Sequence, residues 1–155
     1  MKTRFMVAAS VAILCSSWPL AAQKATSAIP VFVTSAGAAA GFTDPNKDNQ
    51  DTMKDLRNSL KGRKGLVVVG RQEDAAIVLT VLGRERAKVT SSFFGPGRDV
   101  DLKVKFQYRE IETEMSASAL GGLATTGGAW KKAAGKIADQ VEDWVKANRA
   151  KLEAK

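Results

Sequence analysis

The sequence predicts an α+β protein in which one mixed sheet of four to five strands packs against two helices. The first observation is that short β-branched and apolar runs alternate with helical patterns in the order β-α-β-β-β(-β)-α. The second is a strict alternation of apolar residues over residues 100–108, which is typical of a half-buried strand. The third is an apolar stripe at helical spacing near the C-terminus, which predicts a long amphipathic helix packed on the sheet.

The first 22 residues have the three-part plan of a cleavable signal peptide. Lys2 and Arg4 precede an apolar run over residues 5–15, and a short polar stretch then ends in small residues at Ala22. The apolar run is shorter than the roughly 20 residues that a membrane span needs. We therefore expect an exported protein, periplasmic or secreted, with residues 23–28 as a disordered lead-in and residues 29–155 as a single α/β domain.

The one cysteine of the chain lies inside this leader. In a bacterial lipoprotein Cys15 would be the acylated residue, but a small residue normally precedes such a cysteine and here Leu14 does. We favour the interpretation that Cys15 belongs to the apolar core of the signal peptide. The mature chain then contains no thiol and can form no disulfide.

Composition excludes several chemistries and favours others. The chain has no histidine, so metal sites built on His or Cys and nucleophile systems that need a histidine are excluded. Catalysis would have to use carboxylates, Lys, Ser or Tyr, and we expect no enzyme. Lys and Arg outnumber acidic residues 24 to 16, which favours an anionic partner. Export argues against nucleic acid as that partner.

The mature chain is expected to begin with a strand, a loop and a helix. Residues 29–34 are β-branched and aromatic, with Pro30 near the start, where a strand tolerates proline. Residues 35–50 are small and polar and predict loops. Residues 51–61 predict a helix, because apolar residues recur at i, i+3 and i+7 and a glycine follows. These apolar residues are Met53, Leu56 and Leu60.

Further strands are expected in the middle of the chain. Residues 66–69 form a continuous apolar run that predicts a buried strand, and residues 75–89 predict another. Residues 95–97 are Gly-Pro-Gly and predict a turn. In the strand over residues 100–108, one side carries Val100, Leu102, Val104, Phe106 and Tyr108.

The apolar alternation changes phase at Arg109–Glu110. A bulge, or a turn into a further strand, would explain the change, after which Ile111, Thr113 and Met115 share one side. The final helix has the strongest periodicity of the chain. Its apolar stripe consists of Trp130, Ala133, Ala134, Ile137, Ala138, Val141, Trp144, Val145 and Leu152.

Residues 44–55 match the spacing of a calcium-binding loop. Side chains with oxygen atoms, the ligands that calcium prefers, stand at the first, third, fifth and twelfth positions. However, Asn49 replaces the glycine of the usual sharp turn, so the alternative is a polar loop whose Asp48 or Asn49 caps the first helix. The candidate ligands are Asp44, Asn46, Asp48 and Asp55. We expect no cofactor apart from this possible calcium ion.

Basic residues recur at alternate positions of two neighbouring predicted strands. If these strands pair antiparallel, the residues form one basic sheet face, on which an envelope protein or another anionic envelope component could dock. The alternative is an ordinary solvated face opposite the apolar one. The residues are Arg84, Arg86, Lys88, Lys103, Lys105 and Arg109.

Two further features remain open at this level. Phe93 and Phe94 flank the Gly-Pro-Gly turn and either contact a membrane interface or a partner, or fold back over the core. Three glutamates, Glu110, Glu112 and Glu114, alternate on one strand side, and an exposed strand face explains them better than acid–base chemistry does.

Residues 29–84 resemble the small α/β envelope domains of the TolB amino-terminal, LpoB and CsgG-like type. In both, a strand leads to a helix and another strand, and a further strand opens with a pattern like that of residues 74–79 here. The resemblance implies a non-catalytic role in contact with other envelope proteins, and it assigns a role to no individual residue. We therefore expect an exported interaction module. A small calcium- or ligand-binding domain is the alternative, followed by a carboxylate-based hydrolase.

Overall fold

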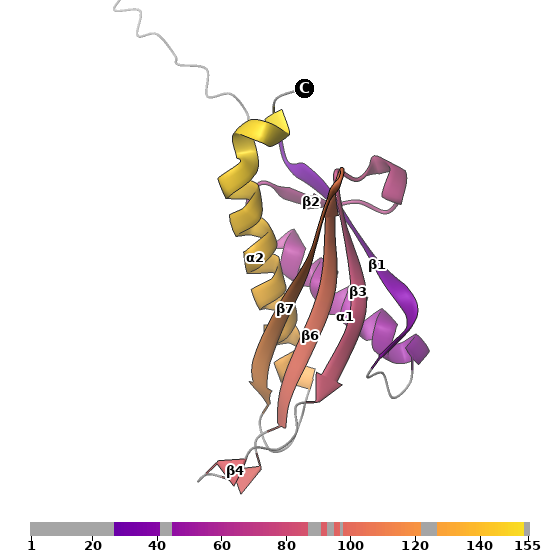
Figure 1. Ribbon diagram of the computed structural model, residues 1–155, viewed down its shortest axis with the longest axis vertical. Coiled ribbons are helices and arrows are strands. Elements are labelled where there is room, and N and C mark those ends of the chain that lie inside the picture. Colours follow the sequence, from indigo (N-terminus) through magenta and orange to yellow (C-terminus); the bar gives the residue numbers. More distant parts are fainter. Residues whose placement is uncertain are drawn as a thin grey trace, which may run out of the picture.

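The computed structural model describes residues 27–40, 45–86, 91, 92, 95, 96, 98–121 and 127–153 (Figure 1). In chain order its elements are β1 (Ile29–Ala40), α1 (Pro45–Lys61), β2 (Leu66–Val68), a short 3₁₀ helix η1 (Gln72–Asp74), β3 (Ile77–Arg86), β4 (Ser91–Ser92), β5 (Gly95–Pro96), β6 (Arg98–Tyr108), β7 (Ile111–Gly121) and α2 (Gly127–Glu153).

Five of the strands form one mixed sheet in the order β2-β1-β3-β6-β7, and β4 pairs only with β5. Strand β1 is parallel to both β2 and β3, whereas β3, β6 and β7 are antiparallel to one another. The predicted α+β class, with a mixed sheet and two helices, is confirmed. The link between β2 and β3 is short because β2 ends and β3 begins beside the same residue, Val31.

Both helices pack on one face of the sheet. The predicted inward residues of β6 are all buried, and so is the stripe of α2 except for Trp144 and Leu152, which are partly buried. Trp144 packs against the rings of Phe106 and Tyr108, at centroid distances of 4.6 and 5.4 Å. On α1, Leu56 and Leu60 are fully buried and Met53 packs against the core. The helical periodicities therefore predicted the packing correctly.

The first helix begins earlier than predicted, at Pro45 rather than near Asp51. Proline is favoured in the first turn of a helix, where its missing N–H leaves no hydrogen bond unmade. Residues 45–50, expected to be loop, are therefore helical. The prediction placed the helix start too late because residues 45–50 are polar and lack the apolar periodicity of a helix.

The first strand is also longer than predicted, because it continues through residues 35–40 with an irregular register. Ser35 lies opposite Val81 and Ala40 lies opposite Gly83, so several residues of β1 bulge out. The amide of Asn49 on α1 stabilises this bulge: it donates to the carbonyl of Gly37 at 2.6 Å and accepts from the Ser35 hydroxyl at 2.7 Å. Where β1 leaves the register with β3, its backbone thus obtains a hydrogen bond from the side chain of Asn49 on α1.

Strand β2 was expected to be buried, but Val67 is 44% exposed. The reason is its position at the edge of the sheet, where Leu66 is buried and Val68 packs partly buried against the core. A continuous apolar run predicts burial on both faces only for a central strand.

The phase change at Arg109–Glu110 is a two-residue turn that joins β6 to β7, with Tyr108 opposite Ile111. Of the three residues expected to share a side on β7, only Met115 is buried, and Ile111 and Thr113 are exposed. Arg109 has φ = 52°, the left-handed region that favours glycine.

Glycine should therefore suit the turn better than alanine. We predict that Arg109→Gly is more stable than Arg109→Ala by about 1 kcal/mol, because both variants lose the same side-chain contacts and only alanine keeps the Cβ that disfavours positive φ. Urea unfolding of the two variants measures the difference. Equal stabilities would show that the turn relaxes to another conformation.

Candidate interaction surface

The second face of the sheet is covered by no helix among the described residues. We call this surface the open face; Figure 1 shows α1 and α2 on the other side. Its central part, on β1 and β3, carries side chains that are partly exposed. These are Phe32, Thr34, Val78, Thr80 and Leu82.

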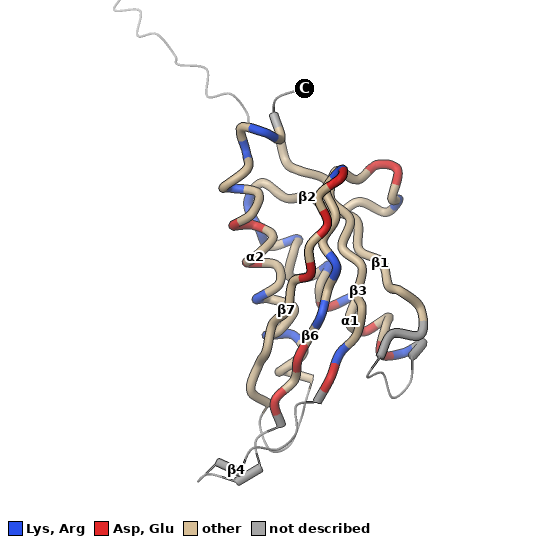
Figure 2. The backbone as a smooth tube through the Cα atoms, in the orientation of Figure 1, with Lys and Arg blue, Asp and Glu red and all other residues tan. Residues whose placement is uncertain are grey.

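Charged residues occupy the part of the open face on β6, β7 and the end of β3. Two lysines, Lys103 and Lys105, lie among five acids, Glu85, Asp99, Asp101, Glu112 and Glu114. Lys105 pairs with Glu112 at 2.7 Å and Lys103 approaches Glu85 at 3.6 Å. Figure 2 shows the basic and acidic segments side by side on these strands. Acids exceed lysines here, so the open face is not basic.

The prediction of a single basic face is wrong because of one extra residue in β3. Val81 lies opposite Val104 and Gly83 lies opposite Lys103, so Leu82 is a bulge. A bulge of one residue moves all later side chains to the other face. Arg84 therefore lies opposite the buried Leu102.

The other residues predicted for the basic face or its neighbouring loop do not share one surface in the described parts of the chain. Arg86 lies opposite Val100 in the register, Arg109 is in the turn after β6, and Lys88 lies outside the described residues, as do Phe93 and Phe94. Lys103 and Lys105 alone lie on the open face as expected. Whether any of these residues binds a partner remains a prediction.

Arg84 instead connects three elements on the helix side of the sheet. Its guanidinium forms an ion pair with Asp48 of α1, lies 3.5 Å from the Thr52 hydroxyl and stacks 4.8 Å from the ring centre of Trp130 in α2. The Arg84 and Asp48 side chains are only 12% and 14% exposed. Such a pair is costly to break, because the remaining charge stays buried without its partner.

The predicted calcium-binding loop is largely helical in the structure. Asn46, Asp48 and Asp55 all lie on α1, where successive residues turn by 100° and cannot converge on one ion as a loop does. Asp48 faces Arg84, and Asp44 lies outside the described residues. Within the described parts of the chain, no three His, Cys, Asp or Glu residues are grouped so as to hold a metal.

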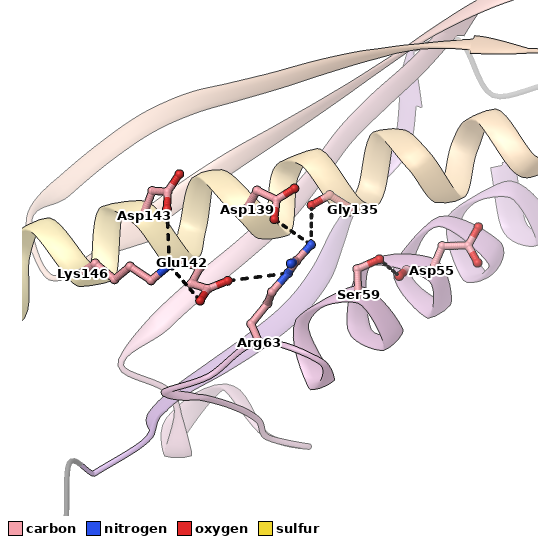
Figure 3. Close-up of polar contacts among 8 residues, drawn as sticks. All are labelled: Asp55, Ser59, Arg63, Gly135, Asp139, Glu142, Asp143 and Lys146. Atoms are coloured by element: carbon pink, nitrogen blue, oxygen red, sulfur yellow. Dashed lines mark hydrogen bonds and ion pairs between the residues drawn. The ribbon is translucent and has the colours of Figure 1, made fainter.

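A second polar cluster joins the helices to each other (Figure 3). Arg63, just after α1, contacts Asp139 at 2.7 Å and Glu142 at 3.8 Å and donates to the carbonyl of Gly135 at 3.3 Å. Lys146 pairs with Glu142 at 2.9 Å, and this hydrogen bond raises the pKa of Lys146. Arg63 connects the end of α1 to α2, whereas the pairs of Lys146 lie within α2, so the cluster has a structural role.

Asp55 has a perturbed carboxyl group on the same side of the molecule. Partial burial raises its pKa, while Lys131 of α2 opposes the rise. The Ser59 hydroxyl donates to the backbone carbonyl of Asp55 and not to its carboxyl group. Burial is therefore the main cause of the raised pKa of Asp55, and the negative charge of Asp51 adds to it.

The outer edge of the sheet is closed by side chains of α2. Lys136 donates to the carbonyl of Ser118 at 2.7 Å, and Gln140 donates to the carbonyl of Ser116 at 2.9 Å. These carbonyls belong to β7, the edge strand, and would otherwise be available to a strand of another chain. The α2 side chains therefore occupy two of the carbonyls along this edge.

None of the described helices is both long and apolar enough to cross a membrane. Although α2 has 27 residues, its exposed side is rich in charges.

Comparison with known proteins gives a fold and no family. No family model matches the sequence, and no curated protein is similar to it. Among solved structures, the chain is similar to PelC from Paraburkholderia phytofirmans, which is a dodecamer. The TM-score is 0.50 at 15% identity, over 71% of this chain and 86% of PelC. A single-site variant of that dodecamer gives 0.53 at 12% identity, over 74% and 88%.

The chain is also similar to a Xanthomonas campestris protein of the DUF330 family, with a TM-score of 0.51 at 9% identity, over 84% of this chain and 90% of that one. Identities this low establish the fold alone. The expected resemblance holds for a small α/β domain, but these neighbours are not of the TolB, LpoB or CsgG-like types.

Sequence reasoning missed that the acids and lysines share the open face. The alternation of β6 was recognised, and it places Asp101 beside Lys103 and Lys105; the pairing of β7 then adds Glu112 and Glu114. Their joint position was deducible once the turn at Arg109 was taken as a hairpin. The bulge at Leu82 had no comparable signal.

The position of Arg84 can be tested by replacing it. We predict that Arg84→Met lowers the free energy of unfolding by about 3 kcal/mol, because it leaves Asp48 partly buried without its cation. Lys103→Met removes an exposed ion pair and should cost less than about 1 kcal/mol. Chemical denaturation compares them, and equal costs would mean that Arg84 also lies on the open face.

Asp55 predicts a pH-dependent effect on stability. Its folded pKa is raised, so folding carries a cost at pH values above that pKa, and the cost disappears below the ordinary pKa of aspartate. Asp55→Asn should therefore stabilise the protein near neutral pH and lose this advantage in acid. Melting curves across this range measure it, with Glu110→Gln, an exposed turn residue, as the control. A gain that does not change with pH would rule out this carboxyl group as its source.

Proposed function

We propose that the chain is an exported, non-catalytic interaction module of the bacterial cell envelope, and that its partner docks on the open face. The observation that carries the proposal is the one-sided packing of the sheet. Both helices cover one face, so the other presents a broad surface built on four strands of rigid backbone.

The chemistry of the open face supports a macromolecular partner. Phe32, Val78 and Leu82 are partly exposed near its centre, whereas charged residues lie toward β6 and β7. Protein interfaces typically have an apolar core with polar groups around it. A rigid sheet also keeps these side chains in place before the partner arrives, which lowers the entropic cost of binding.

Three further observations support the exported, non-catalytic role that we propose. The leader over residues 1–22 supports export. PelC, whose fold is similar, is a dodecamer, so a domain of this shape can work as a subunit of a larger assembly. The absence of histidine from the sequence limits the catalytic chemistry open to the protein and also favours a binding role. No contact in the described parts favours calcium binding or hydrolysis over this interpretation.

The test is a photo-reactive amino acid placed on the open face in the living cell. At Thr80, in the central strand β3, we expect a crosslinked product of defined mass in the envelope fraction. The matched control is Gln72, an exposed residue of η1 that belongs neither to the strands of the open face nor to α1 and α2. No product at Thr80, or the same products at both positions, would contradict the proposal.

A further inference from the structure

The helix side of the molecule differs from the open face in charge. Among the charged residues of α1 and α2 that are exposed, lysines outnumber aspartates eight to three. We call this surface the lysine layer. The lysines are Lys47, Lys54, Lys61, Lys131, Lys132, Lys136, Lys146 and Lys151, and the aspartates are Asp51, Asp139 and Asp143.

The open face has the opposite balance, with five acids and two lysines on β3, β6 and β7. The helices and the open face lie on opposite sides of the sheet, so acids outnumber lysines on one side and exposed lysines outnumber exposed aspartates on the other. Complementary potentials of this kind steer association and select its orientation.

We propose that the open face of one copy of this protein docks on the lysine layer of a second copy. This inference rests on the proposed function, since it names the occupant of the same open face. The alternative pairing, open face against open face, would bring Glu112 and Glu114 toward the acids of the other copy, and like charges disfavour it. The charge balance thus selects a contact between unlike surfaces.

The lysine layer can also cover the apolar centre of the open face. A lysine side chain carries four methylene groups and can lie along apolar surface while its ammonium group reaches an acid or water. Phe32, Val78 and Leu82 would contact these methylene groups, and the ammonium groups would meet Glu112 and Glu114. When two copies associate in this way, one copy keeps an unused open face and the other keeps an unused lysine layer. Further copies can therefore add until a ring closes.

The experiment uses the full chain, purified from the envelope, in analytical ultracentrifugation at low salt. We expect self-association that weakens as salt is raised, because salt screens exposed charges. Glu112→Lys with Glu114→Lys should weaken it at least about tenfold, and Lys131→Glu with Lys132→Glu should do the same. Combining all four reversals should restore association, which a folding defect could not do.

The matched control is Glu73→Lys with Asp74→Lys, which makes the same charge change in η1, outside the residues of either surface. It should leave self-association unchanged. A monomer under all conditions, an equal loss in the control, or no restoration by the combined reversals would overturn the inference.

Crosslinking from Thr80 separates this inference from the proposed function. A product with twice the mass of the chain, lost in the Lys131→Glu, Lys132→Glu variant, supports both. A product containing a different protein overturns the inference and leaves the proposed function standing. No product overturns both.

Discussion

The ion pair between Arg84 and Asp48 lies where three elements meet on the covered face of the sheet. Strand β3 supplies the arginine, α1 supplies the acid, and Trp130 of α2 lies against the guanidinium. The arginine reaches this position only because Leu82 is an extra residue in β3 and reverses the direction of the side chains after it. One inserted residue thus directs a charge toward the helices and leaves the opposite face to be occupied by Glu85.

The charges of the molecule are consequently arranged in three groups with different physical roles. Partly buried charges, such as Arg84 and Arg63, connect elements and fix the helices in place. Charges on the open face form exposed pairs, as between Lys105 and Glu112, which contribute little to stability. The excess of lysine lies on the exposed sides of the helices. In α1 and α2 together, Lys and Arg outnumber Asp and Glu ten to seven, so the helices carry +3 of the net charge of +8 of the sequence.

Local periodicity was sufficient to predict most of the fold. The alternation in β6 and the stripe of α2 are repeated along many residues, so the correct face could be assigned without knowledge of the neighbours. The bulges in β1 and β3 could not be predicted, because each is stabilised by a residue far away in the chain: Asn49 for the first and Asp48 for the second. The acids of residues 44–55 were ambiguous for the same reason. Their spacing suits a calcium-binding loop, but residues 45–55 form a helix that packs on the sheet. On the open face, the lysines and glutamates were each recognised, but their pairing required the strand register.

The two hydrogen bonds from α2 to the carbonyls of β7 have a consequence for biosynthesis. During synthesis β7 leaves the ribosome before Lys136 and Gln140, so for a time the growing sheet has an edge that other extended chains could join. Only when the last helix docks is this edge closed. The C-terminal segment therefore acts as the final safeguard against misassembly of nascent chains, and a ribosome that stops before residue 136 would release a polypeptide prone to aggregate.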